Sequence, residues 1–141
     1  MERLFLILAG AFGALGVAFG AFGAHGLRAR LSVLPDGADR RAFWETAAHY
    51  HLIHALAMGL AAYVVVVGKR EHGARRGAEQ RSSTLGTVAG FCFAGGIVLF
   101  SGSLYAMTLT GIRALGAVTP VGGLLFVAGW VSVALSAWQM R

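Results

Sequence analysis

The stretch Thr46-Ala-Ala-His-Tyr-His-Leu-Ile-His-Ala-Leu-Ala-Met-Gly-Leu-Ala-Ala-Tyr-Val-Val-Val-Val-Gly68 decides the fold of this chain. It contains no Asp, Glu, Lys or Arg, and it is long enough for the roughly 20 residues that a helix needs to cross a bilayer. Three further stretches share both properties, and they are residues 4–24, 82–111 and 114–140. The sequence therefore predicts an all-α membrane protein with four transmembrane helices.

Composition agrees with this fold class. Of the 141 residues, 57% are hydrophobic and 13% are charged, whereas soluble domains carry about a quarter of charged residues. A net charge of +6 would suggest nucleic-acid binding in a soluble chain. Here the basic residues lie in the connections, where membrane topology and anionic headgroups account for them. We therefore expect membrane lipids as contacts and no nucleic-acid partner.

The chain is expected to form a single membrane domain over residues 1–141, built as a compact four-helix bundle. The helices are predicted at about 4–24, 46–67, 85–109 and 119–138, with a polar loop at 69–83. Leucines at 27, 31 and 34 alternate with arginines, which predicts a short amphipathic helix on the membrane surface between the first two spans. The first span exceeds the 7–15 residues of a signal-peptide core, so we expect it to be retained.

Small residues recur at helical spacing in two of the predicted spans. Such residues let helices approach closely where lipid supplies no hydrophobic drive for association. The expected helix-packing residues are Gly13, Gly16, Gly20, Gly86 and Gly90. These faces leave open a homo-oligomer or a membrane-protein partner.

With four spans, both termini lie on one side of the membrane. That side holds seven basic residues, at positions 3, 69, 70, 75, 76, 81 and 141, against five on the other, at 28, 30, 40, 41 and 113. The positive-inside rule then predicts cytoplasmic termini in a bacterial inner membrane.

Polar residues gather at the membrane face where the first helix ends and the second begins. Polar groups inside lipid are costly, face the interior of the protein and often mark function. The predicted polar cluster comprises His25, His54, Tyr105, Arg113 and Thr119. Secondary candidates are Glu45, His49, Tyr50, His51, Ser101 and Ser103.

These residues admit several chemistries. His51 and His54 share a helix face and, with His25, could bind a metal or haem, but no span carries a carboxylate and the Glu-x-x-His pattern of di-iron bundles is absent. Hydrogen bonding between helices is the favoured role for the histidines, and we predict no metal and no cofactor. Arg113 could bind an anion beside the start of the last helix, where Thr119 and Pro120 form a start signal, or could cap the preceding helix. No nucleophile lies beside an acid, so no enzyme is predicted.

Several motifs together resemble a known family. They are Gly20-Ala-Phe-Gly-Ala-His-Gly-Leu27, Tyr50, His54-Ala-Leu-Ala57, Phe100-Ser-Gly-Ser-Leu-Tyr105, Gly111-Ile-Arg113, Gly116, Thr119-Pro-Val-Gly-Gly123 and Gly129-Trp130. The chain is similar to the bacterial domain-of-unknown-function 423 family of small integral membrane proteins, which is similar in turn to a small animal transmembrane protein. His51, where Gln is expected in many members, and His49, where a basic residue is common, depart from the pattern. The family has no settled activity.

The leading functional hypothesis is therefore a structural or accessory membrane component without established activity. The first alternative is a small transporter or a lipid- or anion-binding protein that uses the polar cluster. The second alternative is haem or metal binding through the histidines.

Overall fold

The computed structural model describes residues 1–70 and 76–139, with side chains described for residues 1–68 and 84–139. Its elements in chain order are α1 (Glu2–Ala21), the π-helical η1 (Phe22–Leu27), α2 (Arg28–Leu31), α3 (Gly37–Arg70), α4 (Arg76–Gly96), the π-helical η2 (Ile97–Ser101), α5 (Gly102–Thr110), the 3₁₀-helical η3 (Arg113–Ala117) and α6 (Thr119–Trp138). The described part of the chain contains no strand. The all-α prediction is confirmed.

Four helical segments of the described chain are long and apolar enough to cross a membrane. They are Glu2–Leu31, Gly37–Gly68, Thr84–Thr110 and Arg113–Trp138, which confirms the four predicted spans. Helix α3 has 34 residues and is about 51 Å long at 1.5 Å per residue. A hydrocarbon core is about 30 Å thick, so α3 projects beyond it.

Two connections are shorter than the sequence predicted. The polar loop expected at 69–83 is partly helical, because α3 continues to Arg70 and α4 begins at Arg76. Residues 71–75 of that loop lie outside the described residues. Arg, Ala, Glu and Gln are good helix formers, and a helix end that leaves the membrane needs no apolar face.

The predicted interfacial helix is also shorter and continues directly from η1. Helix α2 spans only Arg28–Leu31, with its leucine side buried against α3. Leu27 and Leu31 are buried on Trp44, whereas Leu34 lies beyond the helix and is 38% exposed. The amphipathic pattern thus located the buried face correctly but overestimated the length of the helix.

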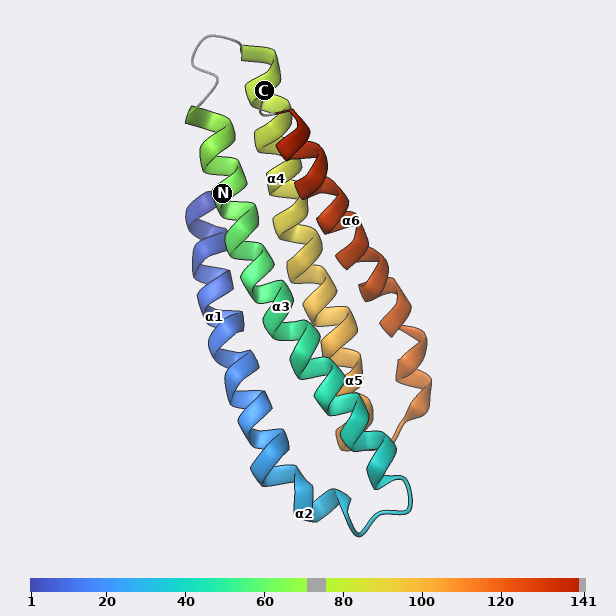
Figure 1. Cartoon of the computed structure of the whole chain (residues 1–141). Coiled ribbons are helices and arrows are strands. Elements are labelled where there is room, and N and C mark those ends of the chain that lie inside the picture. Colours follow the sequence, from blue (N-terminus) through green and yellow to red (C-terminus); the bar gives the residue numbers. More distant parts are fainter. Residues whose placement is uncertain (71–75, 140–141) are drawn as a thin grey trace.

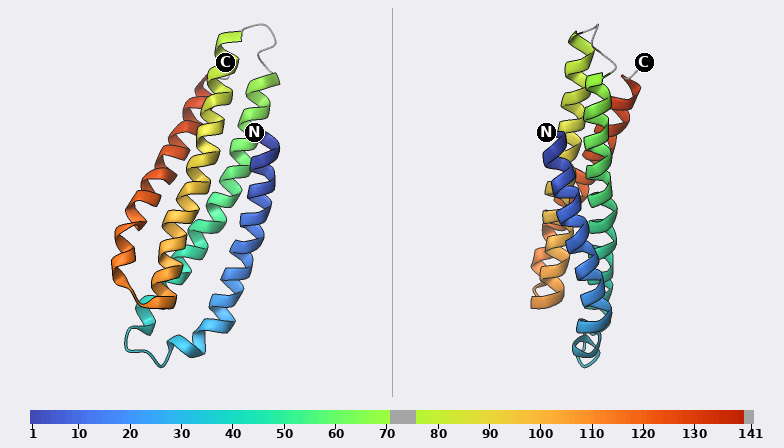
Figure 2. Two further views of the ribbon diagram at one scale, coloured as in Figure 1. Left: turned by 180° about the vertical axis from the view of Figure 1, so that it is seen from behind. Right: turned by 90° about the vertical axis from the view of Figure 1, so that its left-hand side faces the viewer.

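The four spans form a flattened, staggered row rather than a closed bundle. Helix α1 packs along α3, α3 along α4, and α4 along α6 (Figure 1). The view along the row is narrower than the view across it (Figure 2). In their most apolar 18-residue windows, α3 has 56% of residues buried, against 11% for the first span and 22% for the last. Helix α3 is therefore a central helix, and α1 and α6 form the two edges.

Three of the predicted packing glycines lie at helix contacts. A Cβ atom at any of them would meet a neighbouring side chain at 3.0 Å or less, so a larger residue would force the helices to shift. The contacts pair Gly16 with Leu52, Gly86 with Val65, and Gly90 with Phe5. These glycines join α1 to α3, α4 to α3, and α4 to α1.

The other two predicted packing glycines have no such contact. A Cβ atom at Gly13 or Gly20 would meet nothing within 4 Å. Of the three glycines proposed for packing on the first helix, only Gly16 lies against another helix. Periodicity alone does not tell which part of a stripe has a partner.

The backbones of α6 and η2 approach each other closely at Gly122. A Cβ atom there would overlap the backbone nitrogen and Cα of Phe100. Backbone atoms cannot rotate away, so we expect Gly122→Ala to lower the free energy of unfolding by about 1–3 kcal/mol, the usual cost of overpacking. Unfolding of the detergent-solubilised protein, followed by circular dichroism, measures this change.

Gly59→Ala is the matched control, because a Cβ atom at Gly59 in α3 meets nothing within 4 Å. We expect no loss of stability there, since Ala is favoured over Gly within helices by roughly 0.5–1 kcal/mol. Equal effects of the two substitutions would show that the close contact at Phe100 does not limit packing.

Candidate functional site

Trp44 anchors the first span to α3. Its indole Nε1–H donates a 2.8 Å hydrogen bond to the Phe19 backbone carbonyl, and the side chain is 4% exposed. The carbonyl lies just before η1, where the wider π-helical turn alters the regular hydrogen-bond ladder. Gly23 makes room for the indole ring, because a Cβ atom there would overlap it. An interfacial tryptophan thus holds two helices together.

His51 lies in an aromatic cage between α1, α3 and α5. Its Nδ1 is 3.4 Å from the Tyr105 hydroxyl, and its ring makes edge contacts with Phe12 and Phe19. The side chain is 3% exposed, and Nε2 has no hydrogen-bond partner. The pair of His51 and Tyr105 is therefore buried and loosely bonded.

His54 has two hydrogen bonds that fix its tautomer. The Trp130 indole N–H is only a donor, so Nε2 of His54 accepts from it at 3.2 Å. Nδ1 therefore carries the proton, which it donates to the Tyr50 backbone carbonyl at 2.7 Å. The ring also stacks on Phe126 with centroids 3.4 Å apart. His54 is thus a neutral, satisfied link between α3 and α6.

Ser103 and Thr119 join α5 to the start of α6. Their hydroxyl oxygens are 2.8 Å apart, and Ser103 also donates to the Phe100 carbonyl. Thr119 makes no side-chain cap at the start of α6, where Val118 is the N-cap residue and Pro120 lies in the first turn. The predicted start signal therefore marks the beginning of the helix, but Thr119 does not cap it. Ser101 lies deeper, fully buried, with its Oγ unpartnered.

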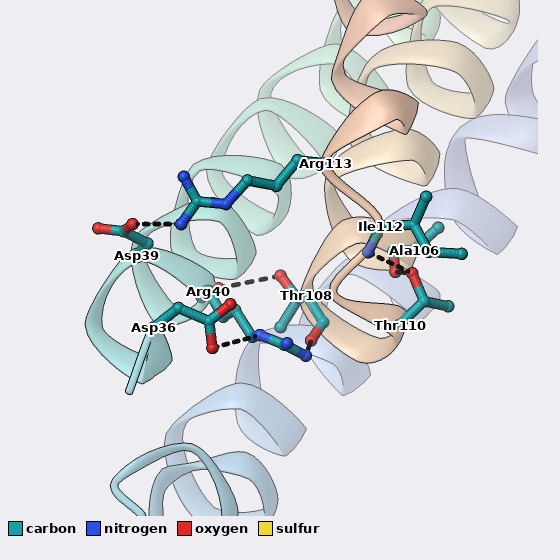
Figure 3. A network of polar contacts seen from close by, with 8 residues as sticks. All are labelled: Asp36, Asp39, Arg40, Ala106, Thr108, Thr110, Ile112 and Arg113. Carbon is teal, nitrogen blue, oxygen red and sulfur yellow. Dashed lines mark hydrogen bonds and ion pairs between the residues drawn. The ribbon is translucent and has the colours of Figure 1, made fainter. Parts of the chain in front are cut away.

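A polar network ties the start of α3 to the end of α5 (Figure 3). Arg40 donates to Asp36 at 2.9 Å and to the Thr108 carbonyl at 3.3 Å, while the Thr108 hydroxyl donates back to the Arg40 carbonyl at 2.9 Å. Gly111 ends α5 with a φ of +75°, and a Cβ atom there would overlap the Arg40 guanidinium. Only glycine satisfies both conditions easily.

The same arginine sets the ionisation of Asp36 outside the membrane. Its hydrogen bond and charge hold the pKa of the Asp36 carboxyl below the ordinary 3.8. Because the folded-state pKa is depressed, the contribution of this pair is present above the ordinary pKa and is lost only as the pH falls below it. The Asp36 carboxyl therefore stays ionised, and paired with Arg40, at physiological pH.

Arg113 pairs with Asp39 rather than with a buried group. Its guanidinium Nη2 is 2.9 Å from the Asp39 carboxylate, and the two side chains are 65% and 57% exposed. Exposed ion pairs contribute about 0–1 kcal/mol. Helix α5 does not end on Arg113, because Gly111 is its C-cap residue. Arg113 therefore forms a surface link between η3 and α3.

The predicted polar cluster does not form as one site. Arg113 contacts residue 39, and residue 54 lies about 22 Å further along α3 at 1.5 Å per residue. His25 is exposed on η1 and belongs to neither group. The expected meeting of His25, His54 and Arg113 is wrong, because a shared membrane face fixes neither the depth nor the direction of a side chain.

Two of the remaining candidates line a lateral cleft between η1 and α3. Glu45 pairs with Arg41 at 2.8 Å, and both side chains are exposed. Glu45 and His49 line the cleft together with His25. Tyr50 faces the other side, where it stacks with His54 and contacts Phe100. The three histidines of α3 therefore lie in three different environments. His49 lines the cleft, His51 lies in the aromatic cage and His54 bonds to α6.

The chemistry of these groups is that of helix contacts. Among the residues that the structure describes, no three His, Cys, Asp or Glu side chains gather where they could hold a metal ion. His54 has both nitrogens engaged, and His51 meets a tyrosine. The arrangement does not bring the histidine pair and His25 together, so the haem or metal alternative has no supporting geometry.

Sequence reasoning missed four participants. Asp36 and Arg40 are four residues apart, a spacing that favours an ion pair and could have indicated theirs. The indole N–H of Trp130 needs a hydrogen-bond acceptor inside a span, and this requirement could have indicated a polar partner such as His54. Nothing in the sequence indicated that Asp39 would meet a residue in η3.

Comparison with known proteins identifies the family. The model of the family described as "Protein of unknown function (DUF423)" matches residues 19–123. A UPF0382 membrane protein of Staphylococcus haemolyticus is 40% identical over 138 residues, covering 97% of each chain. The chain belongs to the DUF423 family.

Further relatives of this DUF423 chain carry the same description. UPF0382 membrane protein YwdK of Bacillus subtilis is 36% identical over 96% of each chain, and a Staphylococcus aureus relative is 34% identical over 97% of each. These names establish a membrane protein and assign no activity, as the resemblance implied. No solved structure matches the chain significantly. The matched range includes Trp44 and His54 but ends before Trp130.

The link between His54 and Trp130 can be separated from the packing of the histidine ring. Trp130→Phe removes the N–H donor and keeps a smaller aromatic ring, and interhelical hydrogen bonds in membranes contribute about 0.6 kcal/mol on average. We expect a loss of about 1 kcal/mol. His54→Ala removes both bonds and the stacked ring, with an expected loss of about 2–4 kcal/mol. Unfolding followed by circular dichroism measures both.

His49→Ala is the control, because His49 is exposed one turn earlier on α3. We expect it to leave stability nearly unchanged. A loss at residue 49 as large as that at residue 54 would contradict the assignment of His54 as a link between helices.

Proposed function

We propose that this protein is a structural or accessory component of the bacterial inner membrane, which works by lateral association of α1 and without catalysis or a bound cofactor. The observation that carries this proposal is the position of α1 at one edge of the row. Only 11% of the most apolar window of its span is buried, against 56% for α3. A large apolar surface therefore faces the lipid side.

The outward surface of α1 suits a second helix. Leu6, Ile7 and Val17 are 58%, 59% and 63% exposed. Gly10 and Gly13 lie on the same helix with open space beside their Cα atoms. Small residues among bulky ones let two backbones approach closely in lipid. A second copy of the chain or another membrane protein fits this surface.

The polar interior supports a role without a cargo. His54, Ser103 and Thr108 each bond to another helix or to a backbone carbonyl. Polar groups in a span mark function by default, but the bonds of these three side chains account for their place in the span. The transporter alternative depended on a convergent cluster, which the geometry does not supply.

The proposed location is the inner membrane, with cytoplasmic termini. Helix α1 begins and α6 ends at the same end of the molecule (Figure 1). The order of the four spans in the sequence assigns seven of the 12 basic residues to that side of the membrane. On the opposite end, Arg40 is held by Asp36 and Thr108. The positive-inside rule supports this orientation.

Photocrosslinking in living cells tests the lateral association. A photoreactive residue at Leu6 or Val17 of α1 is expected to give a protein adduct of defined mass. The same photoreactive residue in place of Leu56 of α3, which is 78% exposed, is expected to give lipid adducts only. Lipid adducts alone at both α1 positions, with a monomer in lipid nanodiscs, would refute the proposal.

Cysteine labelling tests the orientation. In a Cys92→Ser background, a single cysteine replaces Ser32 or is added after residue 141. We expect a membrane-impermeant maleimide to label position 32 on intact spheroplasts and the added cysteine only after lysis. The reverse pattern, or labelling of both before lysis, would overturn the cytoplasmic placement of the termini.

A further inference from the structure

A cleft opens sideways between η1 and the first half of α3. Its volume is about 490 Å³. A second hollow of about 530 Å³ adjoins it beyond α2, and the two share Arg28, Leu31, Arg41 and Glu45. Arg28 and Arg41 therefore lie where the two hollows meet. Neither hollow includes His54, Tyr105 or Arg113.

The cleft is polar at one end and apolar at the other. On α3, its lining begins with Arg41 and Glu45 and continues inward to Ala48 and Leu52. Arg41 and Leu52 are separated by about 16 Å along the helix at 1.5 Å per residue. On the facing segment, Arg28 lies at the outer end and Gly20 at the inner end. A molecule in this cleft meets charge near the surface and apolar atoms deeper in the membrane.

The charges at the mouth favour an anion. Arg41 uses Nε for its bond to Glu45, which leaves its other donors available. Arg28 has no ion-pair partner among the residues whose side chains are described. Two arginines and one glutamate leave one net positive charge. His25 and His49 add further polar atoms beside them.

The inner end of the cleft is kept open by a missing side chain. A Cβ atom at Gly20 would meet nothing within 4 Å, although this residue lines the cleft. The adjoining η1 is a π-helical segment, and such segments are frequent at functional sites. The Trp44 ring, held by its bond to the Phe19 carbonyl, lines the cleft between its two ends.

We propose that this cleft binds one anionic glycerophospholipid. Its phosphate lies between the guanidinium groups of Arg28 and Arg41, which bind phosphate oxygens well because of their planar array of donors. One acyl chain follows the apolar lining past Trp44 toward Leu52 and Gly20. Because the mouth has a single net positive charge, a lipid with one net negative charge is preferred over a zwitterionic one.

Two substitutions address the two ends of the bound lipid separately. Arg28→Gln removes a charge at the mouth, and Gly20→Leu adds a side chain at the inner end, where a Cβ atom would meet nothing within 4 Å. Arg30→Gln is the matched charge control, because Arg30 is exposed and does not line the cleft. Gly59→Leu is the matched control for added volume, because a Cβ atom at Gly59 meets nothing within 4 Å and this residue of α3 does not line the cleft.

Native mass spectrometry measures the binding. The full chain is titrated with an equimolar mixture of phosphatidylglycerol, phosphatidylethanolamine and phosphatidylcholine. We expect one phosphatidylglycerol to be retained per chain. Arg28→Gln should weaken retention about fivefold, the value for one surface charge, and Gly20→Leu should abolish it. Both controls should bind like the unmodified chain.

Three results would overturn the proposal. They are equal retention of the three lipids, equal loss in Arg28→Gln and Arg30→Gln, and undiminished retention in Gly20→Leu. Circular dichroism of each variant verifies that it is helical, and the exposed Arg28→Gln keeps the experiment decisive if Gly20→Leu fails to fold. Failure of lateral association leaves this test unaffected, since it measures the binding of lipid to a single chain.

Discussion

The structure depends on one constraint: a polar group inside hydrocarbon must find its partner within the protein. Helix α3 takes part in three of the bonds that meet it. Trp44 bonds to the first span, His54 bonds to α6, and Thr108 of α5 bonds back to the start of α3. Where apolar surface alone cannot distinguish protein from lipid, these bonds fix which helices meet and at what depth.

The constraint also explains how much of the fold could be predicted. Uncharged runs of sufficient length locate four spans because charge within hydrocarbon is costly. Their ends were less predictable. The segment after Lys69 is polar, yet α3 and α4 both extend into it, because a helix outside the membrane satisfies its own backbone. Hydropathy measures the preference for lipid and not the preference for helix.

The site was less predictable than the spans. The residues were grouped by the membrane face at which their helices end, but His54 lies deeper and bonds to Trp130, whereas Arg113 bonds to Asp39. Those choices depend on helix rotation, which the packing of Phe126 and Gly122 sets across the row. The lateral cleft could not be predicted from the sequence either, because it depends on how η1 and α3 are placed relative to each other.

The staggered row also bears on how the chain is made. Each span packs chiefly on the one that precedes it in the sequence, and the first and last spans occupy opposite edges (Figure 1). During synthesis, a newly inserted helix finds its principal neighbour already in the bilayer. No late closure between the two ends of the chain is required, so assembly can proceed in the order of translation.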